Sequence, residues 1–392
     1  IQQGTYLVYD PCAGSGAMLT QSKKYATDPE GEIKSKASFH LYGQENTGEM
    51  YAVCKSDMLL KGEDPDKIKF GSTLSKYGFD PNLKFNFMLT NPPYGTSWKE
   101  DQKELNVGTA KKIEINDSRF NLEIKNFKGD KEKTCLTSRS NDGQLMFMLH
   151  MLSKMKDPKD GGSRIASVQN GSALFTGDAG SGESEIRKWI IESDLLECIV
   201  SLPDSIFFNT SIPTYLWIVS NKKSEERKGK VQLINGSKFY KSMRKNLGGK
   251  NKEISDEQKN KIVNLYLNFE ENELCKIYSN EFFGYTKITI EQPLLDEDGN
   301  VVSDKKGNPK TDSKKRDYER VPLEQDIDDY FEREVKPHLK DSWLDRTKDK
   351  IGYEINFSRY FYTYKPLRSL EDITQDLLKL DEEIEGKMKE II

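Results

Sequence analysis

Four consecutive residues, Asn91-Pro92-Pro93-Tyr94, carry the clearest chemistry in this sequence. The carboxamide oxygen of Asn91 and the carbonyl oxygen of Pro92 can each accept one N–H of an amino group. Pro92 and Pro93 hold that carbonyl in a fixed direction, because each ring locks its own φ. An amino nitrogen on an aromatic ring is a poor nucleophile, since its lone pair is delocalised, and two acceptors would draw the lone pair back onto it. The motif therefore predicts methyl transfer to a conjugated amino group such as that of adenine.

Tyr94 offers an aromatic face on which an extruded base could stack. Extruding a base costs a few kcal/mol and stacking returns about 1 to 3 kcal/mol, so a second ring is expected. Phe207 and Phe208, followed by Asn209, are the candidates. Two plainer interpretations stay open: the phenylalanines could be core residues, and Asn-Pro-Pro-Tyr could be a turn that closes a strand.

A second motif follows the first expected strand and reads Asp10-Pro11-Cys12-Ala13-Gly14-Ser15-Gly16. Gly14 and Gly16 allow a tight turn close to a ligand, and the helix that follows offers free N–H donors. Dinucleotide-binding enzymes use a related turn, but their third glycine is replaced by Leu19 here. Glu45 follows the second expected strand, where a carboxylate can accept hydrogen bonds from both hydroxyls of a ribose.

The elements that must position these motifs alternate between short apolar runs and stretches of helical spacing. This pattern predicts βαβ units and a mostly parallel sheet. We expect strands at 6–9, 39–42, 68–70, 85–89, 164–168, 196–202 and 215–219, and helices from 49 and at 145–155 and 185–193. Residues 95–142 are polar and predict a long loop or insertion, and the sheet signal fades after about 221. We therefore place a catalytic domain at 1–240 and a mainly helical region at 241–392, with a turn-rich stretch at 294–317.

The composition narrows the class of protein. The chain has 60 basic and 64 acidic residues among 392, so it lacks the basic balance of a stand-alone nucleic-acid binder. Its five cysteines are scattered and it has three histidines, so we expect neither a disulfide framework nor a metal site. No apolar run approaches the roughly 18 residues of a membrane span, and we expect a cytoplasmic location. A basic stretch at 221–252 is either a solvated surface or a strip that contacts phosphates.

The last residues predict a helix with an apolar stripe. Ser369 is a good N-cap, and the following apolar residues keep heptad spacing except at Lys387: Leu370, Ile373, Leu377, Leu380, Ile384 and Ile391. The helix at 369–392 either packs on its own domain or contacts another subunit.

The sequence resembles the modification (methyltransferase, M) subunit of type I restriction-modification systems, in the N6-adenine DNA methyltransferase family. Besides the two motifs above, the resemblance includes 142–147, 162–166, 171–177, 202–203, 207–210, 352–357 and 361–362. It implies a Rossmann-like S-adenosylmethionine-dependent fold, with a mostly parallel seven-stranded sheet and helices on both faces. It also implies DNA, a specificity subunit, a restriction motor-nuclease subunit and a second copy of the chain as partners.

By this resemblance the turn at 10–16 and Glu45 bind S-adenosylmethionine, together with Ser72, Thr73 and Asn91, and residues 91–94 hold the target adenine. Relatives carry Asp where Ser72 stands, so that contact is expected to be weaker or to come from elsewhere. The chain also begins almost at the first strand. We therefore expect a shortened N-terminus and impaired cofactor binding by this piece alone, which calorimetry against the full-length subunit would test.

Two other functions remain open. Methylation of a protein glutamine or of an RNA base could use the same motif, because a carboxamide nitrogen is equally delocalised. The chain could also be a scaffold or DNA-binding module without turnover. The DNA sequence that is recognised and the oligomeric state are not specified by these residues.

Overall fold

The computed structural model describes residues 3–109, 114–125, 129–364 and 369–391. The chain divides into two compact units, Ile1–Phe357 and Ser358–Ile392, which we describe separately.

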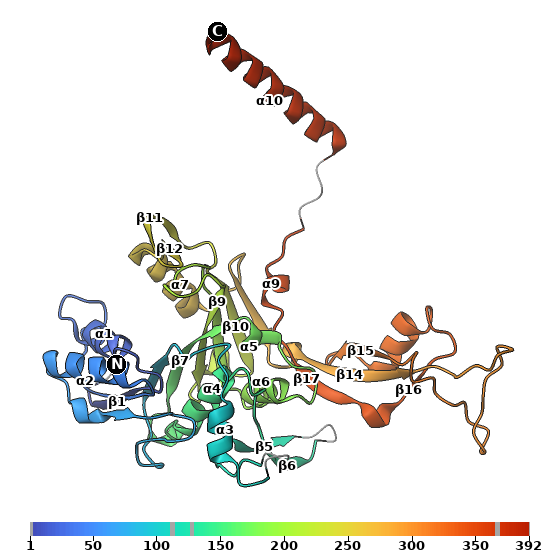
Figure 1. Ribbon diagram of the computed structural model, residues 1–392, viewed down its shortest axis with the longest axis horizontal. Coiled ribbons are helices and arrows are strands. Elements are labelled where there is room, and N and C mark those ends of the chain that lie inside the picture. The colour runs from blue at the N-terminus through green and yellow to red at the C-terminus, as the bar shows by residue number, and fades with distance from the viewer. Residues whose placement is uncertain (1–2, 110–113, 126–128, 365–368, 392) are drawn as a thin grey trace. The chain divides into compact units, whose positions relative to one another are not determined.

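A nine-stranded sheet forms the body of the first unit (Figure 1). Its strands are β1 (Thr5–Asp10), β2 (Ser38–Glu45), β3 (Ile68–Phe70), β4 (Phe87–Thr90), β7 (Arg164–Asn170), β8 (Leu196–Ser201), β9 (Thr214–Ser220), β10 (Lys230–Asn235) and β13 (Cys275–Ser279). Their order across the sheet is β13-β10-β8-β9-β7-β4-β1-β2-β3. The run from β3 to β7 is parallel, β9 is antiparallel to both neighbours, and β13 is antiparallel to β10.

Helices bury apolar side chains against this sheet. The helices of this part are α1 (Ala17–Thr27), α2 (Gly48–Leu60), α4 (Gln144–Ser153), α5 (Ser172–Phe175) and α6 (Gly182–Glu192), with short 3-10 turns η1 (Pro65–Lys67), η2 (Pro158–Asp160) and η3 (Glu225–Arg227). Leu19 of α1 and Met58 of α2 pack with Phe39 and Leu41 of β2 in one buried cluster. Every residue of β8 is buried, as expected of a strand in the middle of a sheet.

The predicted fold class is confirmed, and the seven expected strands correspond to β1 to β4 and β7 to β9. The sheet has nine strands and not the seven that the resemblance implied, because it continues past residue 221, where the strand signal in the sequence fades. β10 continues the sheet beside β8, and β13 pairs with β10. Both strands are short and flanked by charged residues, although Val231, Leu233 and Ile234 are fully buried. The chain thus passes residue 240, where we expected a boundary, and later returns to the same sheet.

The polar segment 95–142 contains regular structure that its sequence did not predict. It holds α3 (Lys99–Leu105) and a hairpin of β5 (Asn121–Lys125) and β6 (Lys131–Cys135). Trp98, Phe120 and Leu136 are buried and anchor it to the body. A few large apolar residues, rather than a periodic pattern, hold this insertion in place.

The region after residue 240 mixes helices with strands. It contains β11 (Lys241–Leu247), β12 (Lys250–Glu253), α7 (Asp256–Asn268), η4 (Glu281–Phe283), β14 (Gly284–Glu291), β15 (Asp317–Pro322), α8 (Ile327–Tyr330), the π-helical turn η5 (Phe331–Val335), β16 (Trp343–Leu344), η6 (Arg346–Lys348), β17 (Lys350–Tyr353) and α9 (Phe357–Tyr360). β14 pairs with β15, β16 and β17 in a small antiparallel sheet that the sequence analysis missed. Between β14 and β15, isolated bridges join 295 to 301 and 303 to 309, in agreement with the predicted turn-rich stretch.

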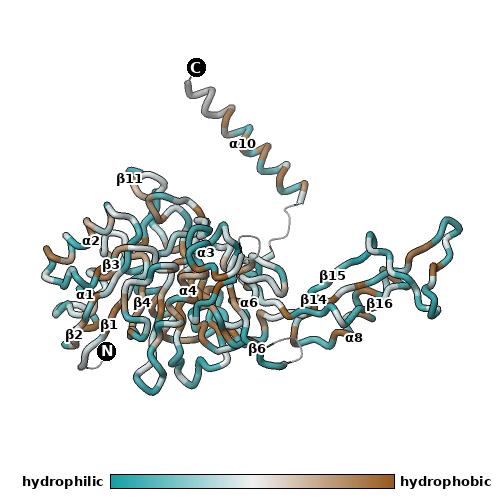
Figure 2. The backbone as a smooth tube through the Cα atoms, turned by 60° about the horizontal axis from the view of Figure 1, so that its bottom comes forward, coloured by the Kyte–Doolittle hydropathy of each residue, from teal (hydrophilic) through white to brown (hydrophobic). Residues whose placement is uncertain are grey.

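The second unit is mainly the helix α10 (Leu370–Ile391). The Ser369 hydroxyl accepts a hydrogen bond from the Asp372 N–H at 3.1 Å, which confirms the predicted N-cap. Apolar and polar residues alternate along the helix (Figure 2), and Ile373, Leu377 and Leu380 are exposed. Among the residues with described structure, no helix combines the length and apolar character needed to cross a membrane.

Candidate active site

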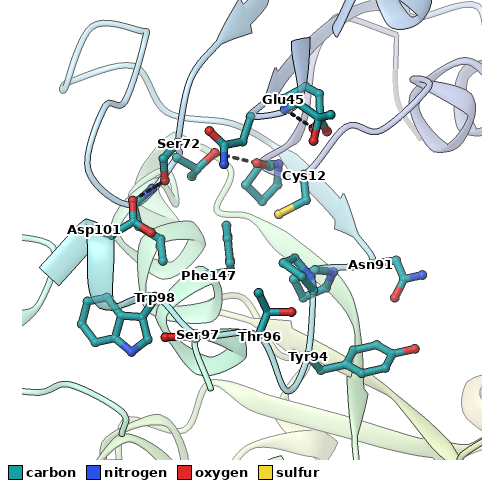
Figure 3. A pocket seen from close by; sticks show the side chains of 18 of the residues that line it. Cys12, Glu45, Ser72, Asn91, Tyr94, Thr96, Ser97, Trp98, Asp101 and Phe147 are labelled. Atoms are coloured by element: carbon teal, nitrogen blue, oxygen red, sulfur yellow. Dashed lines mark hydrogen bonds between the residues drawn. The ribbon is translucent and has the colours of Figure 1, made fainter. Parts of the chain in front are cut away.

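A cavity of about 500 Å³ lies where β1, β2, β3 and β4 reach their carboxyl ends (Figure 3). This is the edge at which open α/β sheets bind ligands. The lining residues are Pro11, Cys12, Glu45, Asn46, Thr47, Gly71, Ser72, Thr73, Leu74, Asn91, Pro92, Pro93, Tyr94, Thr96, Ser97, Trp98, Asp101, Gly143, Phe147 and Asn209. The two predicted motifs, more than seventy residues apart in the sequence, therefore meet at one cavity.

The glycine turn behind this cavity depends on left-handed backbone. Gly14 and Gly16 have φ of 54° and 78°, which residues with a Cβ rarely adopt. A Cβ on Gly16 would also lie 2.7 Å from Met58 Cε and 2.8 Å from Cys54 Sγ. Ala13, Gly14, Ser15 and Gly16 shape the turn without lining the cavity, whereas Pro11 and Cys12 line it.

Glu45 joins the end of β2 to the glycine turn. One of its carboxylate oxygens accepts the Gly14 N–H at 2.9 Å, and the other accepts the Thr47 N–H at 2.8 Å. A carboxylate has about four acceptor positions, so Glu45 keeps capacity for two further donors at the cavity. This is the capacity that two ribose hydroxyls require.

Asp10 is the last residue of β1 and is buried behind the turn, where its carboxylate accepts the Cys12 N–H at 2.9 Å. Burial raises the pKa of this carboxyl to about 7, and the neighbouring Glu45 contributes to the rise, although the Cys12 hydrogen bond opposes it. Asp10 therefore stabilises the glycine turn through the Cys12 N–H, on the side away from the cavity.

The loop after β4 is held in place by Asp142. Asp142 accepts the Gly95 N–H at 3.2 Å, the Gln144 amide at 2.9 Å and the Ser172 hydroxyl at 3.0 Å. These three donors come from the loop, from α4 and from the segment after β7. In Figure 3 Asn91 and Tyr94 lie together on one side of the cavity, opposite Ser72 and Asp101. Asn91 and Pro92, the two predicted acceptors, both line the cavity, where Asn91 is exposed and Pro92 is buried.

The structure adds an acidic residue to this wall that the sequence analysis missed. Asp101 of α3 accepts hydrogen bonds from the Ser72 hydroxyl at 2.5 Å and from the Ser75 hydroxyl at 2.6 Å (Figure 3). Trp98, which precedes α3, is buried and donates its indole N–H to the Arg139 carbonyl at 3.0 Å. Both residues lie in the polar insertion, where nothing in the local sequence singles them out.

Arg119, from the same insertion, ties the cavity wall to the core. Its guanidinium donates to the Thr73 carbonyl at 2.8 Å and to the Leu74 carbonyl, and it pairs with Asp117 at 2.6 Å. It also lies 3.0 Å from His150 Nδ1, while His150 Nε2 meets the Tyr9 hydroxyl. Burial and Arg119 hold the pKa of His150 well below its ordinary value, so this imidazole is neutral.

The candidate stacking residues Phe207 and Phe208 are not among the residues that line the cavity, but their neighbour Asn209 is. Phe208 is 62% exposed, which excludes the core-packing interpretation for this residue. Within the described part of the chain, no group of three or more His, Cys, Asp or Glu residues could hold a metal ion.

Comparison with known proteins decides the family. The model of the N-6 DNA methylase family matches residues 2–283. The chain belongs to this family.

The relatives of this N-6 DNA methylase that we compared are named as methylase or methyltransferase subunits of type I restriction systems. It is 29% identical, over 68% of its length and 41% of the relative, to the type I restriction enzyme MjaVII methylase subunit of Methanocaldococcus jannaschii. It is 28% identical, over 58% of its length and 44% of the relative, to the HindI methylase subunit of Haemophilus influenzae. The type I restriction-modification methyltransferase subunit from Streptococcus thermophilus matches at a TM-score of 0.54 and 25% identity, covering 71% of this chain and 51% of that one. The chain thus spans about two fifths of the length of these curated relatives.

Proposed function

We propose that this chain is the catalytic part of the modification subunit of a type I restriction-modification system, and that it methylates the N6 amino group of adenine in DNA. The observation that carries the proposal is the meeting of the glycine turn after β1 and Asn91-Pro92-Pro93-Tyr94 after β4 at one cavity. The names of the relatives support the type I system.

In this proposal S-adenosylmethionine supplies an electrophilic methyl group on its sulfonium. The residues present fit that cofactor: Pro11, Cys12, Ser72 and Thr73 would surround it, the turn 10–16 would shape its site, and Glu45 would accept its ribose hydroxyls. Asp101 would place a carboxylate next to Ser72. It would thereby supply the acidic group that relatives carry at the position of Ser72.

Asn91 and Pro92 would accept the two N–H bonds of the adenine amino group, and Tyr94 would stack on the base. With the base held in this way, the nitrogen lone pair would be directed at the methyl group that the cofactor supplies, the sulfonium sulfur would be the leaving group, and one proton of the amino group would pass to water. Because the amino nitrogen would become strongly acidic as it gains the methyl group, the residues at the cavity need to provide orientation and not a general base.

DNA, a specificity subunit, a restriction subunit and a second copy of the chain are the proposed partners. The apolar stripe on α10, which includes Ile373, Leu377 and Leu380, would provide the surface for a contact with another subunit. A specificity subunit that grips DNA would also account for a net charge of −4 in a DNA-modifying protein.

A labelled-methyl assay with DNA, RNA and protein substrates, with a specificity subunit co-expressed, tests the proposal. We expect label in DNA, and we expect Asn91→Ala to lower kcat about 10²- to 10³-fold, because one oriented acceptor is lost. Cofactor affinity should change only a few-fold. Asn82→Ala, at an exposed position outside the cavity, is the matched control. Label in RNA or protein alone, or full activity of Asn91→Ala, would refute the proposal.

A further inference from the structure

A basic hairpin lies next to the candidate active site and takes no part in the chemistry proposed above. β11 and β12 pair with each other, and Figure 1 shows them beside α7. From Ser237 to Lys252 the sequence has six Lys or Arg residues and no Asp or Glu, in a chain whose net charge is −4. The positive charge is therefore concentrated locally.

Four of these six cations are exposed, and three of the four lie on β11. Lys241, Arg244 and Lys245 are exposed, and among the residues that the structure describes none of the three takes part in an ion pair. Lys252, by contrast, pairs with Asp204 at 2.5 Å. The hairpin thus uses one lysine for its own attachment and leaves three cations for an anionic partner.

The hairpin is attached to the loop that reaches the cavity. The Gly249 N–H donates to the Phe208 carbonyl at 2.8 Å, and the Asn251 N–H donates to the Ser205 carbonyl at 3.0 Å. The ammonium of Lys250 lies 5.1 Å from the centre of the Phe208 ring. Asn209, the next residue in that loop, lines the cavity with Asn91 and Tyr94.

A glycine in the hairpin turn permits this close approach. Gly248 has φ of 60°, and a Cβ on it would lie 2.7 Å from the Phe208 carbonyl oxygen. The turn and the loop are therefore in contact through their backbones, which places the hairpin beside the loop that carries Asn209.

The geometry points to the β11–β12 hairpin as a clamp for the DNA backbone, in which Lys241, Arg244 and Lys245 neutralise phosphates close to the nucleotide whose base enters the cavity. The inference rests on the proposed function and adds a binding surface to it. Phosphate contacts of this kind position DNA and carry no sequence information. Gripping the backbone beside the cavity would hold the strand while a base is extruded.

The test is the triple variant Lys241→Gln, Arg244→Gln, Lys245→Gln, with Lys24→Gln, Lys34→Gln, Lys36→Gln as a control that removes three exposed lysines on the α1–β2 side. Binding of a fluorescein-labelled mixed-sequence duplex is measured over a salt series. We expect the slope of log K against log salt to become shallower by about 2 to 3 in the hairpin variant only, because each lost phosphate contact accounts for about 0.9. KM for DNA should rise, while kcat at saturating DNA and cofactor affinity stay within two-fold.

The outcomes separate this inference from the proposed function. An unchanged salt slope in a variant that keeps its circular dichroism spectrum, while the parent methylates DNA, overturns the clamp alone. Unchanged DNA binding combined with lost association with the specificity subunit also overturns it, since the cations would then bind a protein. If the parent methylates no DNA although the salt slope responds as expected, the proposed function fails and the clamp stands.

Discussion

Asp10→Asn should make the protein more stable at neutral pH, and the gain should grow with pH. The Asp10 side chain is buried behind the glycine turn and has no cationic partner among the residues that the structure describes, and burial raises its pKa to about 7. Asparagine has the same shape and keeps an oxygen that can accept the Cys12 N–H. It cannot ionise, so it avoids the cost of a buried charge.

The size of the effect follows from the two pKa values. A carboxyl with a pKa of 3.8 in the unfolded chain and about 7 in the folded protein contributes stability that is fully present below about pH 4 and is lost as the pH rises through about 7. Each pH unit in that window removes about 1.4 kcal/mol, for a total of about 4 kcal/mol. This total is an upper limit, because water that enters around the charge lowers the cost of burying it.

Urea unfolding followed by tryptophan fluorescence at a series of pH values measures the difference. We expect the free energy of unfolding of Asp10→Asn to exceed that of the parent by an amount that increases by about 2 to 3 kcal/mol between pH 5 and pH 7. Asp298→Asn, the same change on an exposed carboxylate, should give a difference that does not depend on pH. A constant difference for Asp10→Asn as well would show that Asp10 is ionised throughout, and the reasoning from burial would be wrong.

Two other substitutions probe the cavity wall. Arg119→Met should lower the free energy of unfolding by about 3 kcal/mol, because Asp117 loses its cationic partner and two carbonyls lose their donor. Lys99→Met, at an exposed position, is the control, and a loss below about 0.5 kcal/mol in denaturant titrations would contradict the assignment. Asp101→Asn should weaken S-adenosylmethionine binding about ten-fold in calorimetry, because a charged acceptor at the cavity becomes neutral. The control is Glu100→Gln, on the same helix but 84% exposed at its side chain, which should bind the cofactor as the parent does. Equal affinity of all three proteins would show that Asp101 is not part of the cofactor site.

The parts of the site that could be predicted are those whose local chemistry is distinctive. The glycines at 14 and 16 predict a left-handed turn, and Asn91-Pro92 predicts a fixed pair of acceptors. Both predictions follow from the local sequence and do not depend on the rest of the chain. Alternating apolar runs then place both motifs after strands. The order β3-β2-β1-β4 brings those strand ends together at one cavity, as the resemblance implied.

The parts that could not be predicted depend on contacts between distant segments. Asp101 reaches the cavity because Ser72 and Ser75, far away in the sequence, donate to it, and Arg119 gains its role from two carbonyls in the loop after β3. β13 is recognised only through its pairing with β10. Phe207 and Phe208 were chosen as aromatic residues near a strand end, but the loop presents Asn209 to the cavity.

The insertion between the loop after β4 and α4 has its two ends hydrogen-bonded to each other. The Trp98 N–H donates to the Ser140 carbonyl at 3.0 Å, and the Gly143 N–H donates to the Thr96 carbonyl at 3.1 Å. Closing a longer loop between fixed ends costs little extra entropy, about 0.6 kcal/mol for each doubling of its length. The β5–β6 hairpin is therefore a place where evolution can lengthen, shorten or replace sequence while the geometry around Asn91 is preserved, and where a reporter domain could be inserted into this protein.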